Sequence, residues 1–136
     1  MTIQYVLDTN VVSAIMKNDS RIIARVRGLR PDQIGIPQPV LGEIAFGIER
    51  LPRSKRRDAF ASQFERVRAV FLRVAWTDDV SIRFGEIKAQ LERTGRRIED
   101  FDASIAAHAV SIDAVLVTAN FGHMSRVPRL RVEDWS

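Results

Sequence analysis

The stretch IQYVLDTN, residues 3–10, combines a short strand with the start of a helix. Its β-branched and aromatic residues are typical of a buried strand. Asp8 ends this strand, and Thr9 or Asn10 is the expected N-cap for the apolar run Val11–Met16. The stretch therefore predicts a carboxylate at the carboxyl end of a strand, where open α/β sheets bind ligands. On this stretch alone, the alternative that Asp8 only caps the helix stays open.

Short apolar runs alternate with helical patterns along the rest of the chain, which shows no repeat or linker. This alternation predicts a parallel sheet covered by helices, a three-layer α/β/α sandwich formed by a single domain over residues 1–136. We expect five strands, at about 3–7, 33–36, 72–75, 114–118 and 130–132, and a loop over 120–128. The expected helices are Val11–Lys17, Arg21–Leu29, Val40–Leu51, Lys55–Phe71, Val80–Arg93 and Ala103–Ser111.

Small residues in two of these helices predict close packing. Gly42 and Gly47 are poor helix formers, and in a helix such residues often mark a close approach to another backbone. The segment Ala103–Ser111, ASIAAHAVS, is rich in alanine, which predicts that another element packs closely on it.

The composition limits the possible chemistry. The chain contains no cysteine and only two histidines, His108 and His123, which excludes thiolate sites and disfavours a multi-histidine zinc site. Any metal is expected to be a hard cation held by carboxylates. No apolar run approaches the roughly 18 residues of a membrane span, and no signal-peptide pattern is present, so we expect a cytoplasmic protein with no membrane partner.

The charge balance favours a polyanionic partner. The formal net charge is +4, and most of the basic residues are arginines, whose planar guanidinium suits phosphate contacts. The most basic segment is LPRSKRR, residues 51–57. The alternative interpretation of this segment is a solvated surface without a nucleic-acid role.

Three acids stand at element junctions or in apolar surroundings: Asp8, Glu43 on the third expected helix, and Asp102, the expected N-cap of the alanine-rich helix. Because strand ends and helix starts collect at one edge of a parallel sheet, these acids can converge. Clustered carboxylates need a counter-cation, and Mg²⁺ or Mn²⁺ fits them best. Such a metal activates water and neutralises charge on a phosphodiester. The alternative for Glu43 is a simple position on the helix surface.

Other catalytic templates are missing from the sequence. It contains no phosphate-binding G-x-x-x-x-G-K-[ST] loop, no G-x-G-x-x-G, no G-x-S-x-G and no H-E-x-x-H. The phosphatase pattern of two aspartates also fails, because Asn10 occupies the second position. His108 lies on the alanine-rich helix and is expected to be structural, whereas His123 lies in a loop and has no assigned role.

The order of these segments resembles the PIN-domain family, specifically its VapC-type toxins. The resemblance rests on YVLDTNVVSAIMK, PQPVLGEIAFGIERL, DFDASIAAHAVSIDAVLVTAN and the closing VPRLRVEDW. It implies an α/β/α fold with a five-stranded parallel sheet and a metal-dependent endoribonuclease activity. It also implies an RNA substrate, a homodimer, and a small cognate antitoxin in a type II toxin–antitoxin pair.

The resemblance assigns roles by position. Asp8, Glu43 and Asp102 match the metal-binding acids, so we expect them to hold Mg²⁺, with Mn²⁺ as a possible substitute. Thr9 and Thr118 match small hydroxyl residues near that site. All five positions lie within the quoted motifs.

The fourth acidic position departs from the family pattern. Asn120 stands there, and His123 replaces an acid often found three residues later. The change puts a second metal in doubt, because a neutral amide holds Mg²⁺ more weakly than a carboxylate. Asn120 or Thr118 is expected to orient water or a phosphate oxygen. Asp100 could supply a spare charge, although no motif supports it.

Two further alternatives stay open. The chain could be a non-catalytic module that binds metal or nucleic acid, or a nuclease directed at DNA.

As a candidate antitoxin surface we take the helix pair Arg21–Leu29 and Val40–Leu51, which presents apolar residues flanked by charge. The competing interpretation assigns these apolar faces entirely to the core.

Overall fold

The computed structural model describes residues 2–136 and contains a five-stranded sheet in the order β3–β2–β1–β4–β5. Every neighbouring pair of strands is parallel. The sheet confirms the predicted parallel arrangement, with the last strand starting two residues later than expected. The strands are β1 Tyr5–Leu7, β2 Ile34–Pro37, β3 Leu72–Val74, β4 Val115–Val117 and β5 Val132–Glu133.

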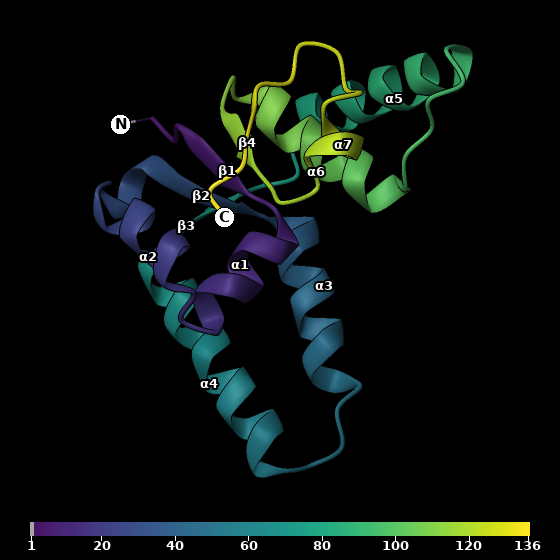
Figure 1. The fold of residues 1–136 in the computed structure, drawn as a ribbon. Coiled ribbons are helices and arrows are strands. Elements are labelled where there is room, and N and C mark those ends of the chain that lie inside the picture. Colours follow the sequence, from purple (N-terminus) through teal and green to yellow (C-terminus); the bar gives the residue numbers. More distant parts are fainter. Residues whose placement is uncertain (1) are drawn as a thin grey trace.

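Helices cover both faces of this sheet (Figure 1). Helices α1 to α4 lie on one side, and α5 to α7 lie on the other. The three-layer α/β/α sandwich is therefore confirmed. Among residues 2–136, no helix has the length and apolar character needed to cross a lipid bilayer. The helices are α1 Thr9–Met16, α2 Ser20–Arg27, α3 Gln38–Glu49, α4 Lys55–Val70, α5 Asp78–Arg93, α6 Asp100–Ser111 and α7 Phe121–Met124, with a 3₁₀ turn at Pro31–Gln33.

The strand order reverses between β1 and β4. The chain leads from β1 outward to β2 and β3, and then returns to place β4 on the other side of β1. The register pairs Leu7 with Val117, and the backbone N–H of Asp8 donates to the carbonyl of Val117 at 2.9 Å. Asp8 and Thr118 therefore leave the two central strands side by side, at the switch point where such sheets bind ligands.

The central strands form the core. Val6, Leu7, Leu116 and Val117 are fully buried, as parallel strands covered on both faces require. Helix α6 packs on α5 and on the sheet through its small residues, which confirms the packing expected from its alanine content. The buried residues of α6 are Ala103, Ser104, Ile105, Ala106, Ala107, His108 and Ala109.

Two predicted N-caps are wrong, and in both cases the observed cap lies upstream of the expected residue. The cap of α1 is Asp8 itself, whose carboxylate accepts from the backbone N–H of Thr9 at 2.7 Å, so neither Thr9 nor Asn10 has this role. Asp102 does not cap α6, because that helix begins at Asp100 after Glu99. At the start of α5, Asp78 and Asp79 lie in the first turn and Thr77 is the cap. Acidic residues are favoured both at the N-cap and in the first turn of a helix, so the sequence alone does not distinguish the two positions.

Two other expectations are corrected. The expected loop over 120–128 contains the short helix α7. The glycines of α3 do not mark close packing, because a Cβ added at Gly42 or Gly47 would meet nothing within 4 Å. Helix α3 begins at Gln38, two residues before the expected start at Val40. Pro39 is tolerated in the first turn because the N–H that proline lacks would have no helical partner there.

The glycine in β2 provides a test of the sheet packing. A Cβ at Gly35 would lie 2.7 Å from Cγ2 of Val74 and 2.9 Å from Cδ1 of Ile3. Because Val74 is stiff and buried, we expect Gly35→Ala to lower the free energy of unfolding by roughly 1–3 kcal/mol. Gly85→Ala, in the exposed open surface of α5, is expected to raise it by about 0.5–1 kcal/mol. Urea unfolding of both variants measures the two signs, and a stabilising Gly35→Ala would contradict this packing.

Candidate active site

The carboxylate of Asp8 is held from three directions at the switch point. Its side chain is 3% exposed. One oxygen accepts from the backbone N–H of Thr9, and the other accepts from the hydroxyl of Thr118 at 2.7 Å and from the amide of Asn10 at 3.4 Å. All of these donors are neutral. Asp8 is therefore oriented precisely while its charge has no cationic partner.

Glu43 reaches the same edge from α3. The hydroxyl of Thr9, the residue after Asp8, donates to Oε1 of Glu43 at 2.6 Å. The side chain of Glu43 is half-buried, so the alternative that it lies simply on the helix surface does not describe its position. Thr9 thus connects the first and second predicted acids, which are 35 residues apart in the chain.

Asp102 faces the other two acids from the first turn of α6. Its pKa is raised above the ordinary value, first by burial and then by the negative charges of Asp8 and Glu43. The charge of Glu99 raises it further, and that of His123 opposes the shift. Asp8 and Glu43 therefore lie within electrostatic range of Asp102. The structure therefore brings together the three acids that the sequence predicted.

These three acids lack the cations that would normally balance them. Among residues 2–136, no lysine, arginine or histidine forms an ion pair with Asp8, Glu43 or Asp102. As they stand, no group of three or more His, Asp and Glu side chains in the described chain is arranged tightly enough to hold a metal ion. The donor set itself consists of carboxylate oxygens with neighbouring hydroxyls, which is the chemistry of a site for a hard divalent cation.

The fourth position is occupied by an amide and an imidazole. The backbone N–H of Asn120 donates to the hydroxyl of Thr118 at 2.9 Å. The side-chain nitrogen of Asn120 lies 3.3 Å from Nδ1 of His123 on α7. Asn120 therefore continues the chain of contacts that starts at Asp8, although it adds no carboxylate to the site.

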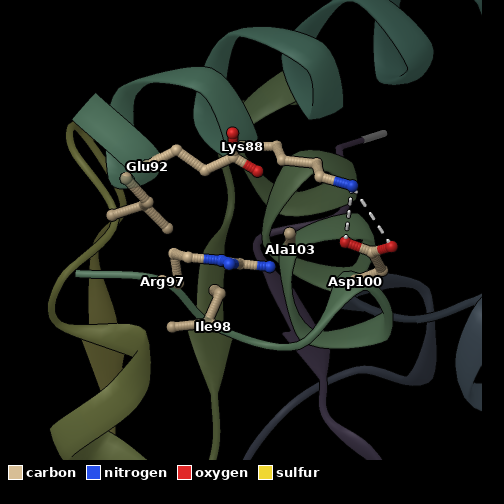
Figure 2. A pocket seen from close by; sticks show the side chains of 7 residues that line it. Lys88, Glu92, Arg97, Ile98, Asp100 and Ala103 are labelled. Carbon is tan, nitrogen blue, oxygen red and sulfur yellow. Dashed lines mark hydrogen bonds and ion pairs between the residues drawn. The ribbon is translucent and has the colours of Figure 1, made fainter. Parts of the chain in front are cut away.

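Asp100 does not serve as a spare ligand. Its carboxylate points to α5, where Nζ of Lys88 lies 3.1 Å from Oδ1 and 3.3 Å from Oδ2 (Figure 2). Arg97 and Ile98 line the same small pocket on the far side of that ion pair. The pairing with Lys88 gives Asp100 a structural role between α5 and α6.

One residue of this site, Asn10, has no predicted role in it. The sequence suggests Asn10 as a cap and as the residue that breaks the phosphatase pattern, yet its side chain bridges the ends of β1 and β4. Its carbonyl accepts from the backbone N–H of Ala119 at 2.9 Å, and its amide lies 3.4 Å from both Asp8 Oδ2 and Thr118 Oγ1. The only signal was the position of Asn10 two residues after a strand-ending acid.

His108 belongs to the core of α6. It is fully buried, its Nδ1–H donates to the carbonyl of Ser104 at 2.7 Å, and its ring packs edge-on against Trp76. Burial lowers the pKa of this imidazole, which favours its neutral form. These contacts agree with the structural role expected for His108.

The raised pKa of Asp102 predicts a pH-dependent cost of folding. Below the pKa of about 3.9 of an unfolded aspartate, Asp102 is protonated in both states and costs nothing. As the pH rises through the higher folded pKa, ionisation destabilises the folded protein. In EDTA, we expect Asp102→Asn to be more stable than the wild type at pH 7 and to lose this gain near pH 3. Urea unfolding at both pH values measures the difference, and an equal gain at both would refute the raised pKa of Asp102.

Comparison with known proteins places the chain in a family. A model of the PIN domain matches residues 5–130. Ribonuclease VapC1 from Haemophilus influenzae (strain R2866) is 34% identical over 97% of this chain and 98% of its own. The tRNA(fMet)-specific endonuclease VapC from Salmonella typhimurium is 30% identical over 98% of each chain. The predicted class, an endoribonuclease, agrees with the names of these relatives.

Solved structures show the same fold. The DNA-bound VapBC structure from Salmonella typhimurium contains a chain with a TM-score of 0.90 and 29% identity, covering 99% of this chain and 100% of that one. The VapBC2 structure from Rickettsia felis, bound to a promoter DNA fragment, gives 0.89 and 27% over 97% and 98%. The chain belongs to the PIN-domain family, and its relatives lie in the VapC branch of that family.

Proposed function

We propose that this chain is a Mg²⁺-dependent endoribonuclease that acts as the toxin of a type II toxin–antitoxin pair. The observation that carries the proposal is the group of three acids, Asp8, Glu43 and Asp102, at the switch point of the sheet without ion-pair partners in the described chain. The names of the VapC relatives, which are ribonucleases and endonucleases, support the same reaction class. We propose the cytoplasm as the compartment, since cellular RNA is met there.

Asp8, Glu43 and Asp102 would hold Mg²⁺, or Mn²⁺ in its place. When bound, such an ion supplies a water of lowered pKa and neutralises charge on the phosphodiester. The protein supplies the positioning. The hydroxyl of Thr118 donates to Asp8 and that of Thr9 donates to Glu43, so each fixes one acid. Because its proton is already used in this way, Thr118 positions Asp8 rather than a water.

Asn120 is left to contact water or a phosphate oxygen. Its side-chain amide is half-buried, and within residues 2–136 its one hydrogen-bond partner is Nδ1 of His123, which leaves the amide oxygen and one proton for a ligand. An amide carries no charge, so this position would add little to the binding of a second cation. We therefore propose one principal metal ion.

An antitoxin partner is supported by the solved relatives, which are VapBC complexes. The structure changes the surface expected for it. On α3, Val40, Ile44 and Ile48 are buried in the core and are not available for docking, whereas Phe46 is exposed. On α2, however, Ile23 and Val26 line a groove of about 310 Å³. We propose this groove, formed with α1 and α4, as the antitoxin site, and a homodimer as the assembly.

The antitoxin proposal makes a prediction about the genome. We expect a short reading frame directly beside the gene of this chain, encoding a protein with a DNA-binding N-terminal segment. Inspection of the neighbouring sequence is sufficient as the measurement. If the gene stands without such a neighbour in every genome that carries it, the toxin role would be refuted while the nuclease proposal would stand.

A non-catalytic module is the second candidate, because Asn120 replaces the fourth acid. The two functions separate in one assay. The protein is stripped with EDTA and then supplied with Mg²⁺ or Mn²⁺ in the presence of structured RNA or of DNA. Cleavage of RNA that returns with the metal supports the enzyme. Binding without cleavage supports the module, and cleavage confined to DNA supports a DNA-directed nuclease.

Asp8→Asn is the direct test of the site. Asparagine still accepts the N-cap hydrogen bond, so the fold should persist. The rate of RNA cleavage is expected to fall by more than roughly 100-fold. Removing a residue that only supports a metal ligand costs roughly 10–100-fold, and Asp8 is expected to be a ligand itself. Asp32→Asn, at the opposite edge of the sheet, is the matched control and should cleave as the wild type does. Wild-type cleavage by the Asp8→Asn variant in Mg²⁺ would disprove this assignment.

A further inference from the structure

A groove leads away from the acids between α1, α3 and α4. Thr9 and Glu43 line its first part, a hollow of about 270 Å³ that also contains Lys17, Arg50 and Arg56. A second hollow of about 230 Å³ continues from it, since Lys17, Arg56 and Phe60 line both, and it ends near Gln63. A ligand bound along this groove would therefore have one end at the candidate active site.

The cations of this groove are not neutralised by the protein. Lys17, Arg50 and Arg56 are exposed, and none of them forms an ion pair with a carboxylate of residues 2–136. The only acid in the lining is Glu43, which belongs to the active site. Many other cations of the chain are paired: Arg25, Arg30, Arg57, Arg68, Arg83, Lys88, Arg129 and Arg131. A line of unpaired cations that starts at a nuclease site matches a phosphate backbone.

The hollow on the other side of the acids has a different charge. Its volume is about 360 Å³, and its charged lining contains Lys88, Arg97 and His123 together with Glu99 and Asp100. Lys88 is already paired with Asp100 (Figure 2). With two acids against two strong cations, this hollow offers a polyanion no net attraction. The charge difference favours the α1–α3–α4 groove as the path of the substrate.

The walls of the groove suit a single strand better than a duplex. Phe60 is half-buried and lines both hollows, so part of its ring is available for stacking with a base. Gly47 lines the first hollow without a side chain, and a Cβ there would meet nothing within 4 Å. Gly47 therefore leaves open space in the groove beside Glu43. It does not serve to bring two helices close together.

We propose that the α1–α3–α4 groove binds single-stranded RNA on one side of the cleaved bond. Lys17, Arg50 and Arg56 hold its phosphates, and Phe60 stacks on a base. This inference rests on the proposed nuclease function and adds a substrate path to it. Unpaired, splayed bases are what proteins read in RNA, so the groove selects loops or ends rather than helical stems.

Binding measured without cleavage tests the groove. In the Asp8→Asn background and in EDTA, a fluorescent single-stranded oligoribonucleotide is titrated at several salt concentrations. The triple variant Lys17→Gln, Arg50→Gln, Arg56→Gln should bind at least about 10-fold more weakly. Its log-affinity should also depend less steeply on log-salt, by about 2, since each lost contact removes about 0.7. The control triple Arg21→Gln, Arg93→Gln, Arg96→Gln loses the same charge elsewhere and should bind within about twofold of the parent.

A second pair of variants tests the open space at Gly47. Gly47→Glu places an acid in the groove, whereas Gly42→Glu makes the same change on the same helix outside it. Both positions have room for a Cβ, so both variants should fold. We expect Gly47→Glu to weaken RNA binding several-fold more than Gly42→Glu. Equal effects of the two would count against the groove.

Measurements of KM and kcat distinguish the groove proposal from the nuclease proposal. In the cleaving protein, loss of the groove cations should raise KM about 10-fold with kcat near that of the wild type. If the wild type cleaves RNA but the two triple variants have the same affinity and KM, the groove is wrong and the nuclease stands. If the wild type does not cleave, the nuclease is wrong, and the binding titration still decides the groove. Loss of antitoxin binding with unchanged RNA affinity would also overturn the RNA path.

Discussion

The structure depends on the anchoring of Asp8 where β1 ends. One oxygen caps α1, and the other receives the hydroxyl of Thr118 from the neighbouring strand β4. The carboxylate thus joins two central strands and a helix at the point where the strand order reverses. Its role in capping and its role in the site are not alternatives, because the hydrogen bond to the helix fixes the direction in which the other oxygen points.

The same anchoring creates an electrostatic cost. Glu43, held by Thr9, and Asp102, in the first turn of α6, bring two more negative charges to this edge. Burial, and then repulsion by Asp8 and Glu43, raise the pKa of Asp102, and the cationic groove begins on the other side of Glu43. The carboxylates repel one another when no cation is bound. A divalent cation that binds to them therefore stabilises the folded protein. Such local conflict is typical of functional sites in otherwise consistent folds.

The architecture could be predicted from the sequence because it depends on local patterns, whereas the metal-binding role of Asp8, Glu43 and Asp102 stays a prediction. Alternating strands and helices determine a parallel sheet, and acids at strand ends converge in it. The N-caps are harder to predict: for α1 the sequence favours Thr9 or Asn10 over Asp8, and for α6 it favours Asp102 over Glu99. Several candidate oxygens precede each helix, and only the backbone geometry selects one. The bridging role of Asn10 depends on a partner 109 residues away, which no local pattern contains.

The central claim is that Asp8, Glu43 and Asp102 form one site for a divalent cation. The most direct measurement is a crystal structure of the protein soaked in Mn²⁺, with anomalous difference maps collected near the manganese edge. The account predicts a single strong peak bound by carboxylate oxygens of Asp8 and Asp102, with Glu43 bound directly or through water. The absence of manganese from this edge of the sheet at saturating concentration, or its binding elsewhere, would contradict the account.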